Sequence, residues 1–211
     1  MQGIAVGAIP ILFAITLHEV AHGWMAKKCG DRTAEMLGRL SLNPLKHVDP
    51  VGTVVVPIMM FMFSGLLFGW AKPVPVAFGN LNRPKQDMIW VALAGPFANI
   101  VMGILWALVL KFTLVSGLAG SFMGEWLVSM SRIGILINAL LAAFNLLPLP
   151  PLDGGRVLRG LVSESIGQFL DRIEPYGLII LVVLLVSGFL WVLVGPILGF
   201  VESLIVFVAG L

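Results

Sequence analysis

Three polar residues stand close together in an otherwise apolar stretch near the start of the chain, in the sequence His18-Glu19-Val20-Ala21-His22. On a helix, the spacing of four residues places both imidazoles on one face, with their Cβ atoms about 5–6 Å apart. Two ring nitrogens can then converge on one tetrahedral Zn²⁺ ion. Glu19 projects beside the pair, where it can take a proton from an attacking water. Because polar residues inside an apolar helix are costly, the cluster indicates a metal site.

A catalytic zinc site needs a third protein ligand and keeps its fourth position for water. His47 lies in a polar connection, and we expect it to be a solvated loop residue. Asp153 is the better candidate, because it follows prolines at positions 148, 150 and 151. These prolines must break the helix before them, and non-helical backbone at membrane depth is tolerated only against protein or a wet cavity. We therefore predict one zinc ion per chain, held by His18, His22 and Asp153.

The composition of the chain fits a lipid environment. Hydrophobic residues make up 59% of its 211 residues, charged residues make up 11%, and the mean hydropathy is +1.03. An average globular domain has about 25% charged residues, so the composition excludes a soluble protein. The net charge of +2 and the lack of a Lys/Arg run argue against nucleic-acid binding. A single cysteine, Cys29, excludes an internal disulfide framework.

Four stretches are long and apolar enough to cross a membrane, at residues 3–26, 88–111, 130–148 and 177–195. The tail after Gly195-Pro196 is apolar but short, and we expect these two residues to separate it from the span before it. Two polar connections, 27–50 and 72–87, contain the segments 39–42 and 74–78, in which apolar and polar residues alternate as in β-strands. Because no repeat, low-complexity run or linker interrupts the sequence, residues 1–211 should form one integral membrane domain.

The stretch 51–70 is also apolar, but prolines lie within it and at both flanks. His22 is near the end of the first span and Asp153 follows the 130–148 span, so these two spans must run parallel if the residues share a metal. A single crossing by 51–70 would make them antiparallel. We therefore expect 51–70 to enter the membrane and return, or its crossing to be undone by 71–87.

The predicted fold is thus an all-α polytopic membrane protein with about four to six transmembrane helices. It includes a re-entrant or β-hairpin element and a proline-broken helix that carries a zinc ligand. In this arrangement residues 27–87 and 153–175 lie on one side of the membrane. That side holds 11 of the 13 basic residues, namely Lys27, Lys28, Arg32, Arg39, Lys46, Lys72, Arg83, Lys85, Arg156, Arg159 and Arg172. Since cytoplasmic loops carry an excess of Lys and Arg, we expect the zinc end to face the cytoplasm.

Two motifs in the right order resemble the signatures of the site-2 protease family of intramembrane zinc metalloproteases. They are HEVAH at 18–22 and NLLPLPPLDGG at 145–155, and the segment GPFAN at 95–99 is similar to the family's intervening Gly-Pro-x-x-Asn element. The alternative for Gly95-Pro96 is a packing kink, and Asn99 and Asn138 could simply bond neighbouring helices. The resemblance extends from the first span to about Arg159, without a PDZ-like insertion, as in the minimal branch of the family.

The resemblance implies that His18, His22 and Asp153 bind zinc and that Glu19 is the catalytic base. It further implies that Asn145 holds the substrate backbone or the oxyanion. The expected enzyme is a zinc metalloendopeptidase in the plasma membrane of a prokaryote.

That enzyme would hydrolyse peptide bonds in or near transmembrane segments of membrane-protein substrates, as in regulated intramembrane proteolysis. Its partners would be the substrate's transmembrane helix and the lipid bilayer, and an unwound substrate could add as a strand to 39–42 and 74–78. One alternative is a membrane metal transporter with the same three ligands, although transit does not need Glu19 between the histidines. The other is a non-catalytic scaffold that binds membrane proteins, which no residue favours. The sequence predicts no oligomeric state.

Overall fold

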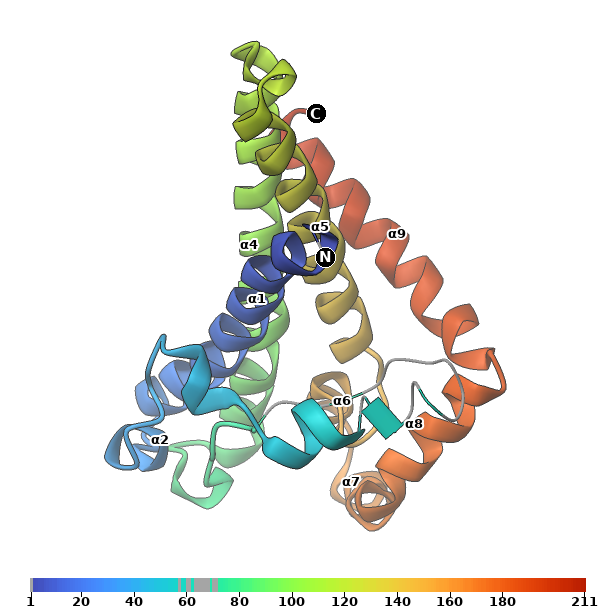
Figure 1. The fold of residues 1–211 in the computed structure, drawn as a ribbon. Helices are drawn as coiled ribbons and strands as arrows, with labels where there is room; N and C mark the ends of the chain where they lie inside the picture. Colours follow the sequence, from blue (N-terminus) through green and yellow to red (C-terminus); the bar gives the residue numbers. More distant parts are fainter. Residues whose placement is uncertain (1, 57, 60–61, 63–68, 70–71) are drawn as a thin grey trace.

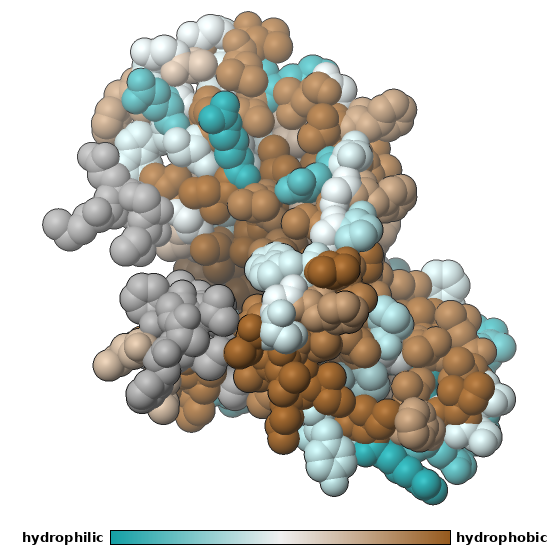
Figure 2. Space-filling model, turned by 90° about the vertical axis from the view of Figure 1, so that its right-hand side faces the viewer, coloured by the Kyte–Doolittle hydropathy of each residue, from teal (hydrophilic) through white to brown (hydrophobic). Residues whose placement is uncertain are grey.

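The computed structural model describes residues 2–56, 58–59, 62, 69 and 72–211, and these residues form helices and connections without a β-strand (Figure 1). Four helices are long and apolar enough to cross a membrane. They are α1 (Gln2–Lys28), α4 (Pro84–Val115), α5 (Phe122–Asn145) and α9 (Phe189–Ala209). Apolar residues cover much of the molecular face drawn in Figure 2. The prediction of an all-α polytopic membrane protein is therefore confirmed.

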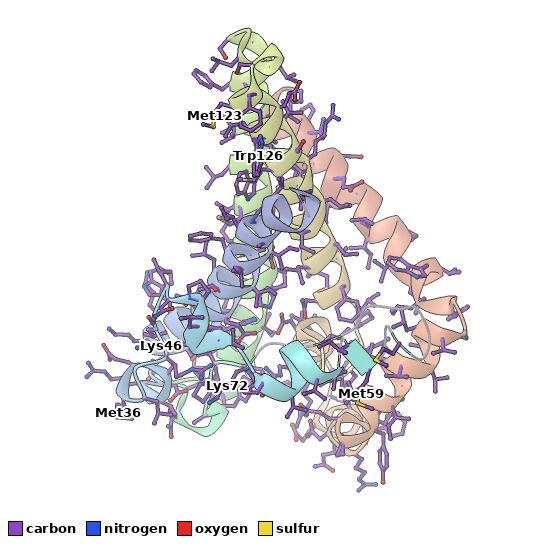
Figure 3. The ribbon with its side chains drawn as sticks, viewed as in Figure 1. Met36, Lys46, Met59, Lys72, Met123 and Trp126 are labelled. Carbon is purple, nitrogen blue, oxygen red and sulfur yellow. The ribbon has the colours of Figure 1, made fainter. Side chains whose placement is uncertain are left out.

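Shorter elements connect the four long helices. They are α2 (Thr33–Met36), η1 (Pro44–His47), the π-helix η2 (Pro50–Val55), η3 (Phe78–Asn80), η4 (Leu118–Gly120), α6 (Asp153–Leu161), α7 (Glu164–Ile173), η5 (Glu174–Tyr176) and α8 (Gly177–Val186). Most of them, including α2, α6 and α7, lie at one end of the bundle (Figure 1). This end also carries Lys46 and Lys72, whereas Met123 and Trp126 lie near the opposite end (Figure 3).

Small residues allow the long helices to pack closely. The core between α4, α5 and α9 contains the buried residues Ala107, Ala139, Ala142, Val201, Ile205 and Ala209. At Gly134 a Cβ atom would lie 2.4 Å from the Trp106 ring, so only glycine admits the ring against α5. Close approach through small side chains is the usual packing mode of helices in lipid, where burial of apolar surface gives little driving force.

The direction of the helices brings the two predicted metal-binding segments together. Figure 1 shows α1 and α5 both running toward the end that carries α2 and α6, while α4 and α9 run away from it. The predicted parallel course of the first span and the 130–148 span is confirmed. The C-terminus of α1 and the N-terminus of α6 consequently lie at the same end of the bundle.

The flanks of the 51–70 stretch are in contact with each other. The backbone N–H of Lys72 donates a hydrogen bond of 2.9 Å to the carbonyl of His47, so the chain leaves this stretch where it entered it. This contact is what a returning segment requires. The predicted return itself falls largely on 57, 60–61, 63–68 and 70–71, which lie outside the described residues.

The prediction of a span at 177–195 followed by a separate tail is wrong. Helix α8 ends at Val186 and α9 begins at Phe189, because Gly188 between them takes the left-handed conformation, with φ of 76°. With ten residues α8 is about 15 Å long, too short to cross a bilayer. The helix α9 continues through Pro196, so the residues expected to form a tail belong to a span.

The strands predicted at 39–42 and 74–78 are also absent from the structure, because side chains rather than a neighbouring strand bind their backbone. Glu19 Oε2 accepts the Val74 N–H at 2.7 Å. Asp31 Oδ2 accepts the Ala77 N–H at 2.7 Å, and a His47 ring nitrogen contacts the Ser41 carbonyl at 2.8 Å. Strand addition of a substrate at these segments stays a prediction.

Candidate active site

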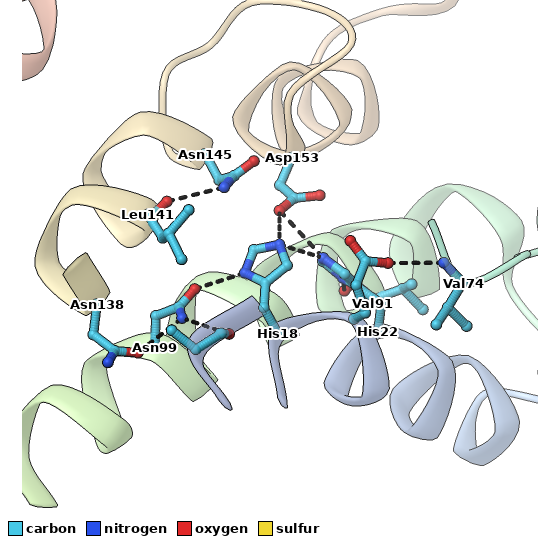
Figure 4. A network of polar contacts seen from close by, with 11 residues as sticks. His18, His22, Val74, Val91, Asn99, Asn138, Leu141, Asn145 and Asp153 are labelled. Carbon is cyan, nitrogen blue, oxygen red and sulfur yellow. Dashed lines mark hydrogen bonds and ion pairs between the residues drawn. The ribbon is translucent and has the colours of Figure 1, made fainter. Parts of the chain in front are cut away.

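Two helices bring His18, His22 and Asp153 to one point (Figure 4). The histidines lie one turn apart on α1, and Asp153 is the first residue of α6, directly after the proline-rich break. Asp153 Oδ2 lies 3.3 Å from each histidine Nε2, and the two Nε2 atoms are 3.0 Å apart. All three side chains are buried. The predicted ligand atoms therefore converge within a space that one ion can fill.

Backbone and amide oxygens of α4 hold the two imidazoles in place. His22 Nδ1 donates to the Val91 carbonyl, and His18 Nδ1 donates to Asn99 Oδ1, both at 2.7 Å. A carbonyl oxygen can only accept, so each Nδ1 carries a proton, and in the neutral imidazole the lone pair is then on Nε2. This is the tautomer that a metal-binding imidazole needs, with its other nitrogen bound to a carbonyl or carboxylate.

The three residues fit a zinc ion chemically. Two lone pairs face each other across 3.0 Å, which is repulsive unless a cation lies between them. Asp153 Oδ2 is buried and accepts no hydrogen bond from the part of the chain that the structure describes. Two neutral imidazoles and one carboxylate form a donor set typical of catalytic zinc sites, with a fourth position left for water or substrate.

Gly95 on α4 makes room for this cluster. A Cβ atom at this position would lie 2.4 Å from His22 Nε2 and 2.6 Å from His18 Cε1. The glycine therefore belongs to the site, whereas Pro96 beside it lies inside α4 without ending the helix.

Glu19 is half-buried beside His18 and His22, and the extended segment before η3 holds its carboxylate. Its Oε2 accepts the Val74 N–H, which leaves Oε1 free of this contact. Val74 itself is buried, and with Leu40 it packs so closely on α1 that a Cβ at Gly23 would lie within 3 Å of both side chains. Sequence reasoning missed the contact with Val74, because residues 55 positions apart meet here through tertiary packing.

Two other polar residues make contacts that the sequence did not predict. Asn145, expected to bind substrate, donates from Nδ2 to the Leu141 carbonyl of its own helix at 3.0 Å. That bond uses one of the two protons of the amide nitrogen, so the substrate role of Asn145 stays a prediction. His47 is buried rather than solvated, and a ring nitrogen contacts the Ser41 carbonyl at 2.8 Å. It is not part of the metal-binding group formed by the described residues.

The model of peptidase family M50 matches residues 6–188, which include every group described above. The chain belongs to this family. As an M50 peptidase it is a zinc metalloprotease, and the cluster of His18, His22 and Asp153 is a possible site for that zinc.

Individual relatives carry names of the same kind. The chain is 38% identical over 181 residues to "Putative zinc metalloprotease YwhC" of Bacillus subtilis, covering 85% of this chain and 79% of the relative. It is 30% identical to "Putative zinc metalloprotease Rip2" of Mycolicibacterium smegmatis, covering 83% of this chain and 64% of the relative. It is 26% identical to "Zinc metalloprotease MJ0392" of Methanocaldococcus jannaschii, covering 77% and 36% respectively. No solved structure matches the chain.

Proposed function

We propose that this M50 peptidase is an intramembrane endopeptidase, which cuts peptide bonds in or near transmembrane segments of other membrane proteins. The observation that carries the proposal is the position of the site on a membrane-spanning helix. His18 lies nine residues before Lys27 at the end of α1, which corresponds to about 14 Å along the helix. In a hydrocarbon core of about 30 Å, a site at that depth can contact peptide bonds that are buried in the membrane and that a soluble protease cannot reach.

His18, His22 and Asp153 hold the zinc ion in this proposal. When bound, zinc supplies Lewis-acid polarisation of the scissile carbonyl and favours ionisation of water. Glu19 Oε1 accepts the proton of the attacking water, while Val74 N–H fixes the other carboxylate oxygen. The carbon–oxygen bond then forms, the carbon–nitrogen bond breaks, and Glu19 passes the proton to the leaving amine. Asn145 on α5 binds the substrate backbone or the oxyanion with the amide proton that the Leu141 carbonyl does not take.

The proposed location is the plasma membrane of a prokaryote, with the site toward the cytoplasm. The parallel course of α1 and α5 supports a single side for the ligands, and most basic residues belong to that side. Cytoplasmic segments carry such an excess of Lys and Arg. Regulated intramembrane proteolysis is the physiological process that this arrangement would serve.

Comparative membrane proteomics tests the proposal. Cells that produce the wild type are compared with cells that produce Glu19→Gln, and Glu125→Gln at the exposed start of α5 is the matched control. We expect at least one membrane protein to accumulate uncut, and to co-purify, only with Glu19→Gln. Identical membrane proteomes in all three strains would contradict intramembrane proteolysis. Zinc flux that persists in Glu19→Gln cells would favour a transporter.

A further inference from the structure

A chain of buried amide groups leads from the metal cluster into the core of the bundle. His18 Nδ1 contacts Asn99 Oδ1 on α4, and Asn99 Nδ2 donates to Asn138 Oδ1 on α5 at 3.0 Å. Both asparagines are fully buried. Asn138 has no contact with the metal cluster of its own, so its role in the site can only be exerted through Asn99 (Figure 4).

Two backbone carbonyls fix the direction of the hydrogen bonds that link Asn138, Asn99 and His18. Asn138 Nδ2 donates to the Gly134 carbonyl at 2.8 Å, so Asn138 must turn its oxygen toward Asn99. Asn99 Nδ2 also donates to the Ala14 carbonyl at 3.1 Å, which uses both of its protons. A carbonyl cannot donate, so neither amide can be flipped without bringing two acceptors or two donors together.

We propose that Asn138 is a positioning residue for zinc binding, which acts through Asn99 to fix the tautomer and orientation of His18. With its nitrogen committed to Asn138 and Ala14, Asn99 presents only oxygen to His18. The imidazole is then protonated at Nδ1 and keeps the Nε2 lone pair aimed at Asp153 and His22. The three helices α1, α4 and α5 are thereby coupled to the metal site through side-chain amides.

The inference rests on the proposed ligand set and is tested by zinc affinity rather than by proteolysis. The full-length protein is purified in detergent, and its zinc dissociation constant is measured by competition with a chelator. Partners that orient a zinc-binding histidine typically change metal affinity by about 10–100-fold. We expect a loss of that size for Asn99→Leu and a loss of several-fold for Asn138→Leu. Ser131→Ala, two turns away on the same buried face of α5, should bind zinc as the wild type does.

A double-mutant cycle separates positioning from simple helix packing. If Asn138 acts through Asn99, adding Asn138→Leu to Asn99→Leu should cause no further loss of zinc affinity. Wild-type affinity in Asn138→Leu, or an equal loss in both backgrounds, would overturn the inference. Should Asn138→Leu not fold, Asn138→Ser is too short to reach Asn99 and should give the same cycle. Wild-type zinc affinity in His18→Ala would instead overturn the ligand set itself.

Discussion

Gly95 is the residue at which one methyl group would most directly disturb the metal site. We expect Gly95→Ala to displace the imidazoles of His18 and His22, because the new Cβ would lie within 2.6 Å of both rings. The variant should lose most of its bound zinc. Gly199→Ala on α9 is the control, since apart from the adjoining backbone of its own helix no heavy atom lies within 4 Å of the Cβ position there. Zinc analysis of the two purified variants checks the prediction, and equal wild-type zinc content would contradict it.

The candidate metal ligands could be picked out from sequence, and their convergence expected, because their signal is local. The spacing of His18 and His22 is a property of one helix, and Asp153 follows a proline-rich break that is visible in the sequence. The partners that hold these groups could not be predicted. Val91 and Asn99 contact the histidines from 69 and 81 positions away, and only the packing of α4 on α1 brings them there. The Gly-Pro-x-x-Asn segment was the one sequence signal for Asn99.

Among the elements, Asp31 connects the turn after α1 to residues 74–80, the segment whose Val74 N–H donates to Glu19. Its carboxylate accepts hydrogen bonds from Ala77 N at 2.7 Å and from Asn80 Nδ2 at 3.2 Å, and from Thr33 within the turn. Burial raises the pKa of Asp31, but these hydrogen bonds outweigh it and hold the pKa below its usual value. The ionised form therefore stabilises the packing of residues 74–80 against α1.

A depressed pKa gives this contribution a defined pH dependence. The contribution is fully present above the unfolded-state pKa of about 3.9 and is lost as the pH falls through the lower folded-state value. We expect Asp31→Asn to lower the free energy of unfolding at pH 7 by about 1–3 kcal/mol. The difference from the wild type should shrink below about pH 4. Thermal unfolding of both proteins in detergent, at pH 7 and below about pH 4, measures this difference in stability. A difference independent of pH would contradict the role of the charge.

The boundary between α8 and α9 shows which helix signals dominate in an apolar segment. Sequence patterns favour a break at Gly195-Pro196, yet α9 continues through these residues, and the break lies at Gly188 between α8 and α9. A proline inside a membrane helix is tolerated, because neighbouring groups can satisfy the freed carbonyl. A glycine with positive φ ends the helix instead, because its backbone leaves the helical region altogether. Both signals are present in the sequence, and the sequence pattern alone does not rank them.

At the scale of the whole molecule, the helix directions and the charge distribution make a joint prediction. If the site faces the cytoplasm, the connection between α4 and α5 faces the outside. In a Cys29→Ser background, an impermeant thiol reagent applied from outside should label Ser121→Cys but not Asn82→Cys or Ser163→Cys. Labelling of intact cells, followed by labelling after lysis as a control for reactivity, checks this arrangement. Outside labelling at Asn82→Cys would place the metal-site end outside and contradict the proposed orientation.

The central claim is that Glu19 supplies the proton-transfer chemistry of a zinc site built by His18, His22 and Asp153. Zinc content and cleavage are measured together on the purified wild type and three variants, with a membrane substrate trapped by Glu19→Gln. We predict that Glu19→Gln keeps about one zinc per chain and loses cleavage by about 10²–10⁴-fold, as expected for removal of a general base. Asp153→Ala should lose both zinc and cleavage, whereas Asp171→Ala on α7 should keep both. Wild-type cleavage by Glu19→Gln would contradict the role of Glu19 as the base, and a full complement of zinc in Asp153→Ala would contradict its role as a ligand.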